Sequence, residues 1–348
     1  MSTKINVKDD VTLKDIAEVV GKSVAAVSRA LNNHDDISEE TRAYIKQVAQ
    51  DMGYTPNLMA RRLQKRKTDT LGFILPVLSP RDSDPYFAEL LAGVANEATA
   101  YGLDLLVSTS KPGPEEELAY QRLVNSHRVD GIIVARPRWH DIRIQLLLEK
   151  EFPFVVIGKA DPPDKCLTVT DDESEGALLI VEHLISQGHE RIALINTPSD
   201  LTFSTNFFNG FRKAVSKANL SINEDFLEES DFSQKDGYRV AQLLLSRPKI
   251  PTAIVAADDV VALGALAAIQ DQGFEVGHDL AVTGYGDILL SEHSQPPLTT
   301  AHRPTYTIGQ QACEMLVKKL EGETVENEYV IIKPSLVIRQ SSDLALWL

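Results

Sequence analysis

Residues 11–31 read Val-Thr-Leu-Lys-Asp-Ile-Ala-Glu-Val-Val-Gly-Lys-Ser-Val-Ala-Ala-Val-Ser-Arg-Ala-Leu, and this stretch decides how the chain begins to fold. Thr12 followed by Asp15 has the spacing of a helical capping box, and apolar residues then recur at helical intervals. Gly21 predicts the end of this helix, and Ser23 predicts the N-cap of a second helix. Two helices joined by a short turn that contains glycine are typical of a helix-turn-helix.

A third helix is predicted after Ser38, which is a suitable N-cap with Glu39 and Glu40 in the first helical turn. The residues expected on its inner face are Thr41, Ile45, Val48 and Met52. Residues 1–56 are therefore predicted to form a small all-α module.

The predicted second helix is suited to the major groove of DNA, where the second helix of a helix-turn-helix binds. If Val27 and Leu31 face the core, the outward residues are Val24, Ala25, Ala26, Ser28 and Arg29. Within this set Arg29 alone can make a bidentate hydrogen bond to guanine, whereas the small apolar side chains fit a thymine methyl group. The alternative from these residues is an ordinary three-helix bundle with an exposed arginine.

Charge is unevenly distributed along the chain. The whole sequence holds 35 Lys and Arg against 50 Asp and Glu, a net charge of −15 that is unusual for a DNA-binding protein. Residues 1–67, however, hold 12 basic and 9 acidic residues, whereas residues 68–348 hold 23 and 41. Basic residues gather at 61–67, where they are suited to phosphate contacts, and the acidic remainder would repel DNA. A solvated linker is the alternative interpretation of this basic segment.

Short apolar strands alternate with helical patterns from residue 70 onward, which is typical of parallel sheets built from right-handed βαβ units. The predicted strands are 71–77, 103–108, 131–135, 154–157, 191–196, 253–256, 280–283 and 329–332. The pattern restarts near residue 160. We therefore expect an α/β fold with two doubly wound parallel-sheet subdomains and a ligand site in the cleft between them.

The chain resembles the lac-repressor (LacI/GalR) family of bacterial transcription regulators. The resemblance is strongest in Val11-Thr12-Leu13-Lys14-Asp15-Ile16-Ala17, Val24-Ala25-Ala26-Val27-Ser28-Arg29, Ser38-Glu39-Glu40-Thr41-Arg42, Gly53-Tyr54-Thr55-Pro56-Asn57 and Ala60-Arg61-Arg62-Leu63. Weaker signatures in the body include Tyr86-Phe87-Ala88-Glu89-Leu90 and Pro296-Pro297-Leu298-Thr299-Thr300. The resemblance implies a body like a periplasmic sugar-binding protein, with a chain that crosses between the subdomains three times.

Four segments are predicted on this basis. They are a DNA-binding head at 1–56, a hinge helix and linker at 57–69, an N-terminal effector subdomain at 70–160 with 293–325, and a C-terminal effector subdomain at 161–292 with 326–340. The crossings are expected near 159–163, 288–294 and 322–328. In the hinge, Leu63 is expected to insert into the minor groove as a wedge, to contact a second hinge helix, or to do both.

The DNA-binding candidates combine the outward face of the second helix with positions that match the family. The complete set is Thr12, Ser23, Val24, Ala25, Ala26, Ser28, Arg29, Asn32, Thr41, Tyr54, Asn57 and Leu63.

Candidate effector-binding residues lie at or just after strand ends, where open parallel sheets bind ligands. Asp258 and Asp259 end one such strand, and we expect Asp258 to bind the effector while Asp259 caps the next helix. The resemblance adds aromatic positions for a ring face, of which Phe87 is equally suited to packing at a helix start. The complete set is Tyr86, Phe87, Arg136, Lys159, Phe232, Asp258 and Arg303.

Three positions depart from the sugar-binding members of the family. Phe207 stands where these members usually have arginine, Gly286 where they usually have aspartate, and Arg303 where glutamine is common. Because the arginine and the aspartate are both absent, neither leaves the other as an unpaired buried charge, which is compatible with a neutral pocket. Arg136, Lys159 and Arg303 could instead donate to hydroxyls or to an anionic group, so the charge of the effector stays open.

Catalytic, metal-binding and membrane functions find no support in the sequence. It has no Gly-x-Ser-x-Gly elbow, P-loop or His-Glu-x-x-His motif. Cys166 and Cys313 lack neighbours at metal-ligand spacing and are expected to be thiols in a reducing cytoplasm. Without an apolar leader or an apolar run of 18 residues, export and membrane insertion are not expected. We therefore expect a cytoplasmic protein with no cofactor and no enzymatic activity.

The combined interpretation is an effector-responsive regulator, expected to repress genes of carbohydrate use and to bind a sugar. A two-fold homodimer predicts a pseudo-palindromic, double-stranded DNA operator. Nine residues follow Arg339, too few for a tetramerising coiled coil, which favours the dimer. The alternative is a sugar-binding module for sensing or transport without DNA binding, against which the helix-turn-helix argues.

Overall fold

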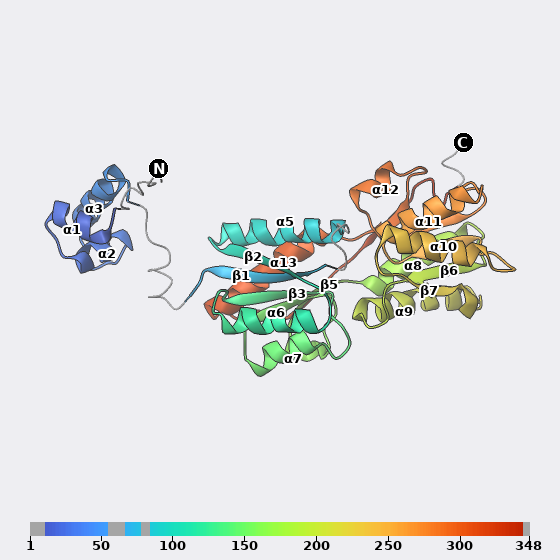
Figure 1. Ribbon diagram of the computed structural model, residues 1–348, viewed down its shortest axis with the longest axis horizontal. Helices are drawn as coiled ribbons and strands as arrows, with labels where there is room; N and C mark the ends of the chain where they lie inside the picture. The colour runs from blue at the N-terminus through green and yellow to red at the C-terminus, as the bar shows by residue number, and fades with distance from the viewer. Residues whose placement is uncertain (1–10, 55–66, 78–83, 344–348) are drawn as a thin grey trace, which may run out of the picture. The chain divides into compact units, whose positions relative to one another are not determined.

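The computed structural model describes residues 11–54, 67–77 and 84–343. The chain divides into two units, Met1–Lys67 and Thr68–Leu348, and each is described by itself. The first unit is the head, whose three helices are α1 (Leu13–Val20), α2 (Val24–Leu31) and α3 (Glu39–Asp51) (Figure 1). The three helices of the sequence prediction are thus confirmed. The predicted hinge helix, with Asn57 and Leu63, lies outside the described residues.

Side-chain caps set the helix ends of the head. The Thr12 backbone N–H donates to Asp15 Oδ2 at 2.8 Å, which is one half of the predicted capping box. Gly21 ends α1 with φ of 63°, a left-handed conformation that glycine adopts without steric cost. Ser23 Oγ accepts from the Ala26 N–H at 3.2 Å and begins α2. The buried core of the head consists of Ile16, Ala17, Val27, Ala30, Ile45 and Ala49.

The first subdomain of the second unit is a six-stranded parallel sheet in the order β11-β5-β4-β3-β1-β2. The strands are β1 (Thr70–Pro76), β2 (Asp104–Ser110), β3 (Gly131–Ala135), β4 (Phe154–Ile157), β5 (Leu167–Asp171) and β11 (Tyr329–Ile332). One face packs against α5 (Pro85–Ala100) and α13 (Thr305–Glu321), the other against α6 (Pro114–Asn125) and α7 (Ile142–Glu149) (Figure 1). Because both faces are covered, the central strands are continuous apolar runs.

The second subdomain repeats this plan with the sheet order β12-β10-β9-β8-β6-β7, in which β12 is antiparallel to β10. The strands are β6 (Ile192–Asn196), β7 (Leu227–Glu229), β8 (Ala253–Ala256), β9 (Ala281–Gly286), β10 (Thr299–His302) and β12 (Ser335–Val337). The helices are α8 (Glu173–Ser186) and α9 (Thr202–Lys217) on one face, α10 (Gln234–Leu245) and α11 (Asp259–Asp271) on the other, and the short α12 (Leu289–His293). Two single 3-10 turns are η1 (Pro163–Lys165), between β4 and β5 of the first subdomain, and η2 (Glu224–Phe226), directly before β7. The α/β class with two parallel-sheet subdomains is therefore confirmed.

The sequence prediction found eight of these strands and missed β5, β7, β10 and β12. Three strands change the predicted subdomain boundaries, because β5 and β11 belong to the first sheet while β10 belongs to the second. The predicted C-terminal subdomain of 161–292 with 326–340 therefore wrongly includes β5 and β11, and the predicted N-terminal segment 293–325 wrongly includes β10.

The three crossings between the sheets lie at 171–173, 302–305 and 332–335. They were expected near 159–163, 288–294 and 322–328, about ten residues too early in each case. The Pro-Pro sequence at 162–163 is a turn between two neighbouring strands of one sheet, not a boundary between subdomains. Within the described ranges no helix is long and apolar enough to cross a membrane.

Candidate functional site

The outer face of α2 carries the residues predicted to meet base edges. Val24 is 43% exposed, Ala25 and Arg29 are exposed, and Ala26 and Ser28 are half-buried. The core residues of the same helix lie on its opposite face. The predicted division into inner and outer faces is therefore confirmed, and the DNA contacts stay a prediction.

Arg29 has a partner within the head. Its Nη1 lies 2.6 Å from Asp36 Oδ2, and its Nε donates to the Ala25 carbonyl at 3.4 Å. Both side chains of the ion pair are about half exposed. The sequence carries no signal for this pair because Asp36 lies in the loop between α2 and α3, outside any helical pattern.

Three other DNA-binding candidates make local contacts in the head. Asn32 ends α2 and its Nδ2 donates to the Ser28 carbonyl at 2.8 Å. Thr41 Oγ1 accepts from the Ser38 hydroxyl at 2.9 Å, and Tyr54 packs against the head core. Asn32 remains exposed, so its capping role leaves the side chain accessible to DNA.

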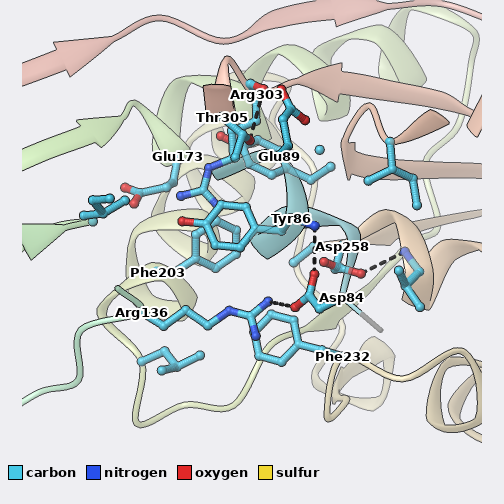
Figure 2. A pocket seen from close by; sticks show the side chains of 18 of the residues that line it. Asp84, Tyr86, Glu89, Arg136, Glu173, Phe203, Phe232, Asp258, Arg303 and Thr305 are labelled. Carbon is cyan, nitrogen blue, oxygen red and sulfur yellow. Dashed lines mark hydrogen bonds and ion pairs between the residues drawn. The ribbon is translucent and has the colours of Figure 1, made fainter. Parts of the chain in front are cut away.

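A cavity lies in the second unit between the two subdomains, near the carboxyl ends of their strands (Figure 2). Of the predicted effector-binding residues, those that line it are Tyr86, Arg136, Phe232, Asp258 and Arg303. The sequence analysis missed further lining residues, among them Asp84, Glu89, Glu173, Phe203, Tyr285 and Thr305. The cavity volume of about 50 Å³ accommodates a few water molecules, which is too little for a sugar ring.

Arg136 spans the cavity from the first subdomain to the second. It follows β3 with φ of 50° and forms an ion pair with Asp84, the N-cap of α5. Its guanidinium lies over the ring of Phe232, 3.9 Å from the ring centroid (Figure 2). Phe232 follows β7, so this stacking contact joins the strand ends of both sheets.

Arg303 enters the cavity from the crossing between β10 and α13. Its Nη2 lies 2.7 Å from Asp171 Oδ1, and the hydroxyl of Tyr285 donates to the other Asp171 oxygen. The Arg303 guanidinium also lies 4.5 Å from the ring centroid of Tyr86. Phe207, which replaces the arginine of sugar-binding members, is fully buried and packs edge-on against Tyr285 at 5.3 Å. Phe207 and its aromatic neighbours thus fill the space where sugar-binding members have arginine. The positive charge near this place comes instead from Arg303, at the crossing between β10 and α13.

Two carboxyl groups that line the cavity have a raised pKa. Burial, reinforced by the negative charge of Asp171, raises the pKa of Glu173 to about 8. Burial and the charge of Asp84 raise the pKa of Asp258 to about 7, against a lowering effect of Arg136. Near neutral pH these groups therefore exchange between a carboxylic acid, which can donate a hydrogen bond, and a carboxylate, which only accepts.

The N-cap of α11 is Asp258 and not Asp259, which differs from the prediction. Asp258 is the N-cap of α11, and its Oδ1 accepts from the Val260 N–H at 2.8 Å while the residue also lines the cavity. Asp259 lies inside the helix and accepts from the Thr300 and Ser291 hydroxyls, at 2.6 and 2.9 Å. The expectation that Asp259 caps the helix is therefore wrong.

Phe87 and Lys159 are not among the residues that line the cavity. Phe87 is buried in the core of the first subdomain, where its ring contacts Phe73 edge-on at 6.0 Å. This is the helix-start packing that the sequence left open for Phe87. Lys159 follows β4 and is half-buried.

Residues 137–139 of the first subdomain contact residues 200–205 of the second at the edge of the cavity, and we call this the rim contact. The Thr202 N–H donates to the Pro137 carbonyl at 3.1 Å, and the Trp139 N–H donates to the Asp200 carbonyl at 3.0 Å. The Trp139 indole also donates to Thr205 Oγ1 at 3.0 Å. These hydrogen bonds hold the strand ends of the two sheets together on one side of the cavity.

Comparisons with known proteins agree with this architecture. The family described as "Bacterial regulatory proteins, lacI family" matches residues 12–57, and the "Periplasmic binding protein-like domain" matches residues 181–342. The chain is 34% identical to the HTH-type transcriptional regulator AglR of Rhizobium meliloti, over 95% of this chain and 94% of the relative. It is 32% identical to the HTH-type transcriptional repressor PurR of Histophilus somni, over 95% and 98%.

Solved structures give the same result. The lac repressor dimer bound to operator and the anti-inducer ONPF matches with a TM-score of 0.84 and 27% identity, over 96% of this chain and 100% of that one. The complex of the transcriptional regulator CelR with cellobiose matches with a TM-score of 0.75 and 29% identity, over 95% and 100%. These proteins are transcriptional regulators and not enzymes. The chain belongs to the lacI family of bacterial regulatory proteins and is a DNA-binding transcriptional regulator.

Proposed function

We propose that this regulator is a cytoplasmic repressor of carbohydrate-use genes whose operator affinity changes when an uncharged sugar binds in the cleft. The observation that carries the proposal is the chemistry of the cavity, where aromatic faces and hydrogen-bonding carboxyl groups surround two arginines already paired with carboxylates. The similar structure of CelR is a complex with cellobiose, which supports a sugar as the ligand class.

An uncharged ligand fits this cavity better than an anionic one. Arg136 is paired with Asp84, and Arg303 is paired with Asp171, so a carboxylate already balances the positive charge of each arginine. Glu89 and Asp258 add carboxyl groups to the same wall. A sugar phosphate would have to displace a carboxylate and approach further acidic groups, whereas sugar hydroxyls can pair with both acids and arginines.

Entry of a sugar requires the Arg136 side chain to move. The guanidinium occupies the ring face of Phe232, which is the surface on which a sugar ring would stack, and the remaining cavity is too small for a ring. The sugar would therefore replace Arg136 on Phe232. If this exchange favours one arrangement of the subdomains, the difference in affinity supplies the coupling to DNA, typically about 1–3 kcal/mol.

A homodimer on a pseudo-palindromic operator completes the proposal. The lac repressor structure, described as a dimer bound to operator, supports this assembly for a chain that is similar over 96% of its length. Two symmetric heads require two half-sites of opposite orientation. Light scattering of the full chain should give twice the mass of 38.4 kDa.

The decisive experiment screens neutral mono- and disaccharides, sugar phosphates and purines by thermal shift, since a ligand that binds only the native state raises the melting temperature. We expect neutral sugars to stabilise the protein and to change its affinity for an operator selected from random DNA. Purines are included because several relatives carry the name PurR. Stabilisation by purines and not by sugars would overturn the proposed effector class.

Two variants test the location of the site. Phe232→Ala should abolish the sugar response and retain operator binding, because it removes the stacking face. Lys159→Ala is the matched control, since Lys159 follows a strand end but does not line the cavity. A response that survives Phe232→Ala, or that Lys159→Ala removes, would contradict the proposed site.

A further inference from the structure

We propose that Asp36 is a positioning residue for DNA recognition, which holds the guanidinium of Arg29 ready to read a guanine and weakens binding where no guanine is present. The inference rests on the proposed role of Arg29 as the base-reading residue of α2. It assigns a function to a loop residue that no helix pattern of the sequence singles out.

The loop that carries Asp36 is fixed to the head on both sides of this residue. Arg42 Nη2 donates to the carbonyl of His34 at 2.9 Å and to the carbonyl of Ile37 at 3.1 Å. Lys46 Nζ donates to Asn33 Oδ1 at 2.6 Å. The Asp36 carboxylate is therefore presented to α2 by a loop that α3 holds, not by a freely moving turn.

The pair leaves three N–H donors of Arg29 without a partner in the described head. An arginine side chain has five N–H donors, of which Asp36 takes one on Nη1 and the Ala25 carbonyl takes the one on Nε. The second N–H of Nη1 and both of Nη2 have no other described partner in the head. A bidentate contact to guanine O6 and N7 would use one N–H of Nη1 and one of Nη2 at the end of the guanidinium, so guanine can bind without breaking the Asp36 pair when Asp36 takes the other N–H of Nη1.

The ion pair of Arg29 with Asp36 should favour the cognate DNA over random DNA in two ways. A guanidinium held in place loses less rotamer freedom when it binds guanine, which strengthens the cognate complex. On other sequences the Asp36 carboxylate adds a negative charge beside the phosphates without the compensating guanine contact, which weakens the complex. Asp36 should therefore increase the ratio of cognate to random affinity more than it increases cognate affinity.

The neighbouring Asp35 provides a charge-matched control. It is exposed, belongs to the same loop and forms no ion pair or hydrogen bond within the described head. Asp35→Ala removes the same charge at nearly the same place but leaves the Arg29 pair intact. A change in DNA affinity that both variants share would come from the lost negative charge. A difference between them would come from the ion pair of Arg29 with Asp36.

The experiment measures the affinity of the full-length protein for an operator selected from a random DNA pool, for the same operator with the Arg29-contacted guanine replaced, and for random DNA. Asp36→Ala should strengthen random-DNA binding and reduce the cognate-to-random ratio by at least about fivefold, which is the lower end of what one bidentate base contact contributes. Asp35→Ala should strengthen binding to all three DNAs equally. Asp36→Glu should recover part of the lost ratio.

A double-mutant cycle separates this inference from the proposed role of Arg29. In an Arg29→Ala background, Asp36→Ala should change the three affinities by a common factor, because no guanidinium remains to be positioned. Identical ratios for Asp36→Ala and Asp35→Ala would overturn the inference. An Arg29→Ala variant that loses affinity equally on all three DNAs would instead overturn the base-reading role of Arg29. Unchanged melting temperatures confirm that each variant folds.

Discussion

Arg29 is the side chain on which sequence discrimination by the head should depend most. Arg29→Ala should cost about 1–3 kcal/mol more at the operator than on random DNA, because a bidentate guanine contact is made only on the cognate sequence, whereas the lost positive charge weakens binding to both. Fluorescence anisotropy with labelled operator and random duplexes measures both affinities. An equal loss on the two duplexes would mean that Arg29 contacts phosphate.

Asp258 should make the stability of the protein depend on pH. Its pKa is raised to about 7 in the folded protein, so between about pH 4 and pH 7 the folded state binds more protons than the unfolded chain. Unfolding free energy should therefore fall as pH rises through this window. Asp258→Asn keeps an N-cap residue and removes the titration, so its urea-unfolding midpoint should fall less between pH 5 and pH 8.

Glu173 provides the internal reference for this measurement. Its pKa is raised in the same direction and its titration is present in both proteins, so a residual pH dependence is expected in Asp258→Asn. If wild type and variant lose stability in parallel between pH 5 and pH 8, Asp258 does not titrate in this range.

The residues of the cavity were only partly predictable from the sequence. The rule that ligands bind at the carboxyl ends of parallel strands found Arg136 and Asp258, but it could not find Phe203, which lies in the first turn of α9, seven residues beyond the end of β6. Lys159 obeys the rule and does not line the cavity, because a strand end fixes the backbone position and not the direction of a long side chain. Which of two adjacent aspartates caps α11 depends on a helix boundary, and patterns locate boundaries only to within one or two residues.

Close helix packing in the first subdomain depends on a glycine of α5. A Cβ built on Gly93 would lie 2.2 Å from the carbonyl oxygen of Tyr306 in α13, which is a steric overlap with backbone. Gly93→Ala should therefore lower the free energy of unfolding by about 1–3 kcal/mol, although alanine is the better helix former. Urea unfolding measures this change.

Thr99→Ala on the exposed side of α5 is the control, and it should change stability by less than about 0.5 kcal/mol. If Gly93→Ala were as stable as the wild type, α5 and α13 would be able to separate without cost.

The missed strands have a common physical cause. β5 and β10 are rich in threonine, and although buried they lack the apolar run by which the other strands were recognised. β7 and β12 have three residues each and lie at sheet edges, where few apolar contacts are required. The first two crossings were misplaced for the same reason, since they follow β5 and β10 directly, whereas the third follows β11, which was predicted but assigned to the wrong subdomain. The head was predicted well because caps and periodicity are local.

At the scale of the second unit, the rim contact should report whether the cleft changes when a sugar binds. The Trp139 indole bonds to Thr205 across the two subdomains, so its environment depends on their relative position. We expect sugar binding to change the tryptophan emission of the wild-type protein and to leave that of Trp139→Phe nearly constant. The chain has two tryptophans, so the variant retains one as a reference. A change of equal size in both proteins would rule out a rearrangement at the rim.

The three crossings also determine the order in which this protein can become complete during synthesis. The helix-turn-helix needs only neighbouring residues, so it can form as soon as it leaves the ribosome. The first sheet is complete only after β11 and α13, which covers one of its faces, have been synthesised, and the second sheet only after β12 has been synthesised. A chain that stops before Thr305 would therefore lack parts of both effector subdomains at once, while still carrying an intact DNA-binding head. Such a truncated product would keep the helix-turn-helix but lack a complete effector cavity, because Thr305, which lines the cavity, would be missing.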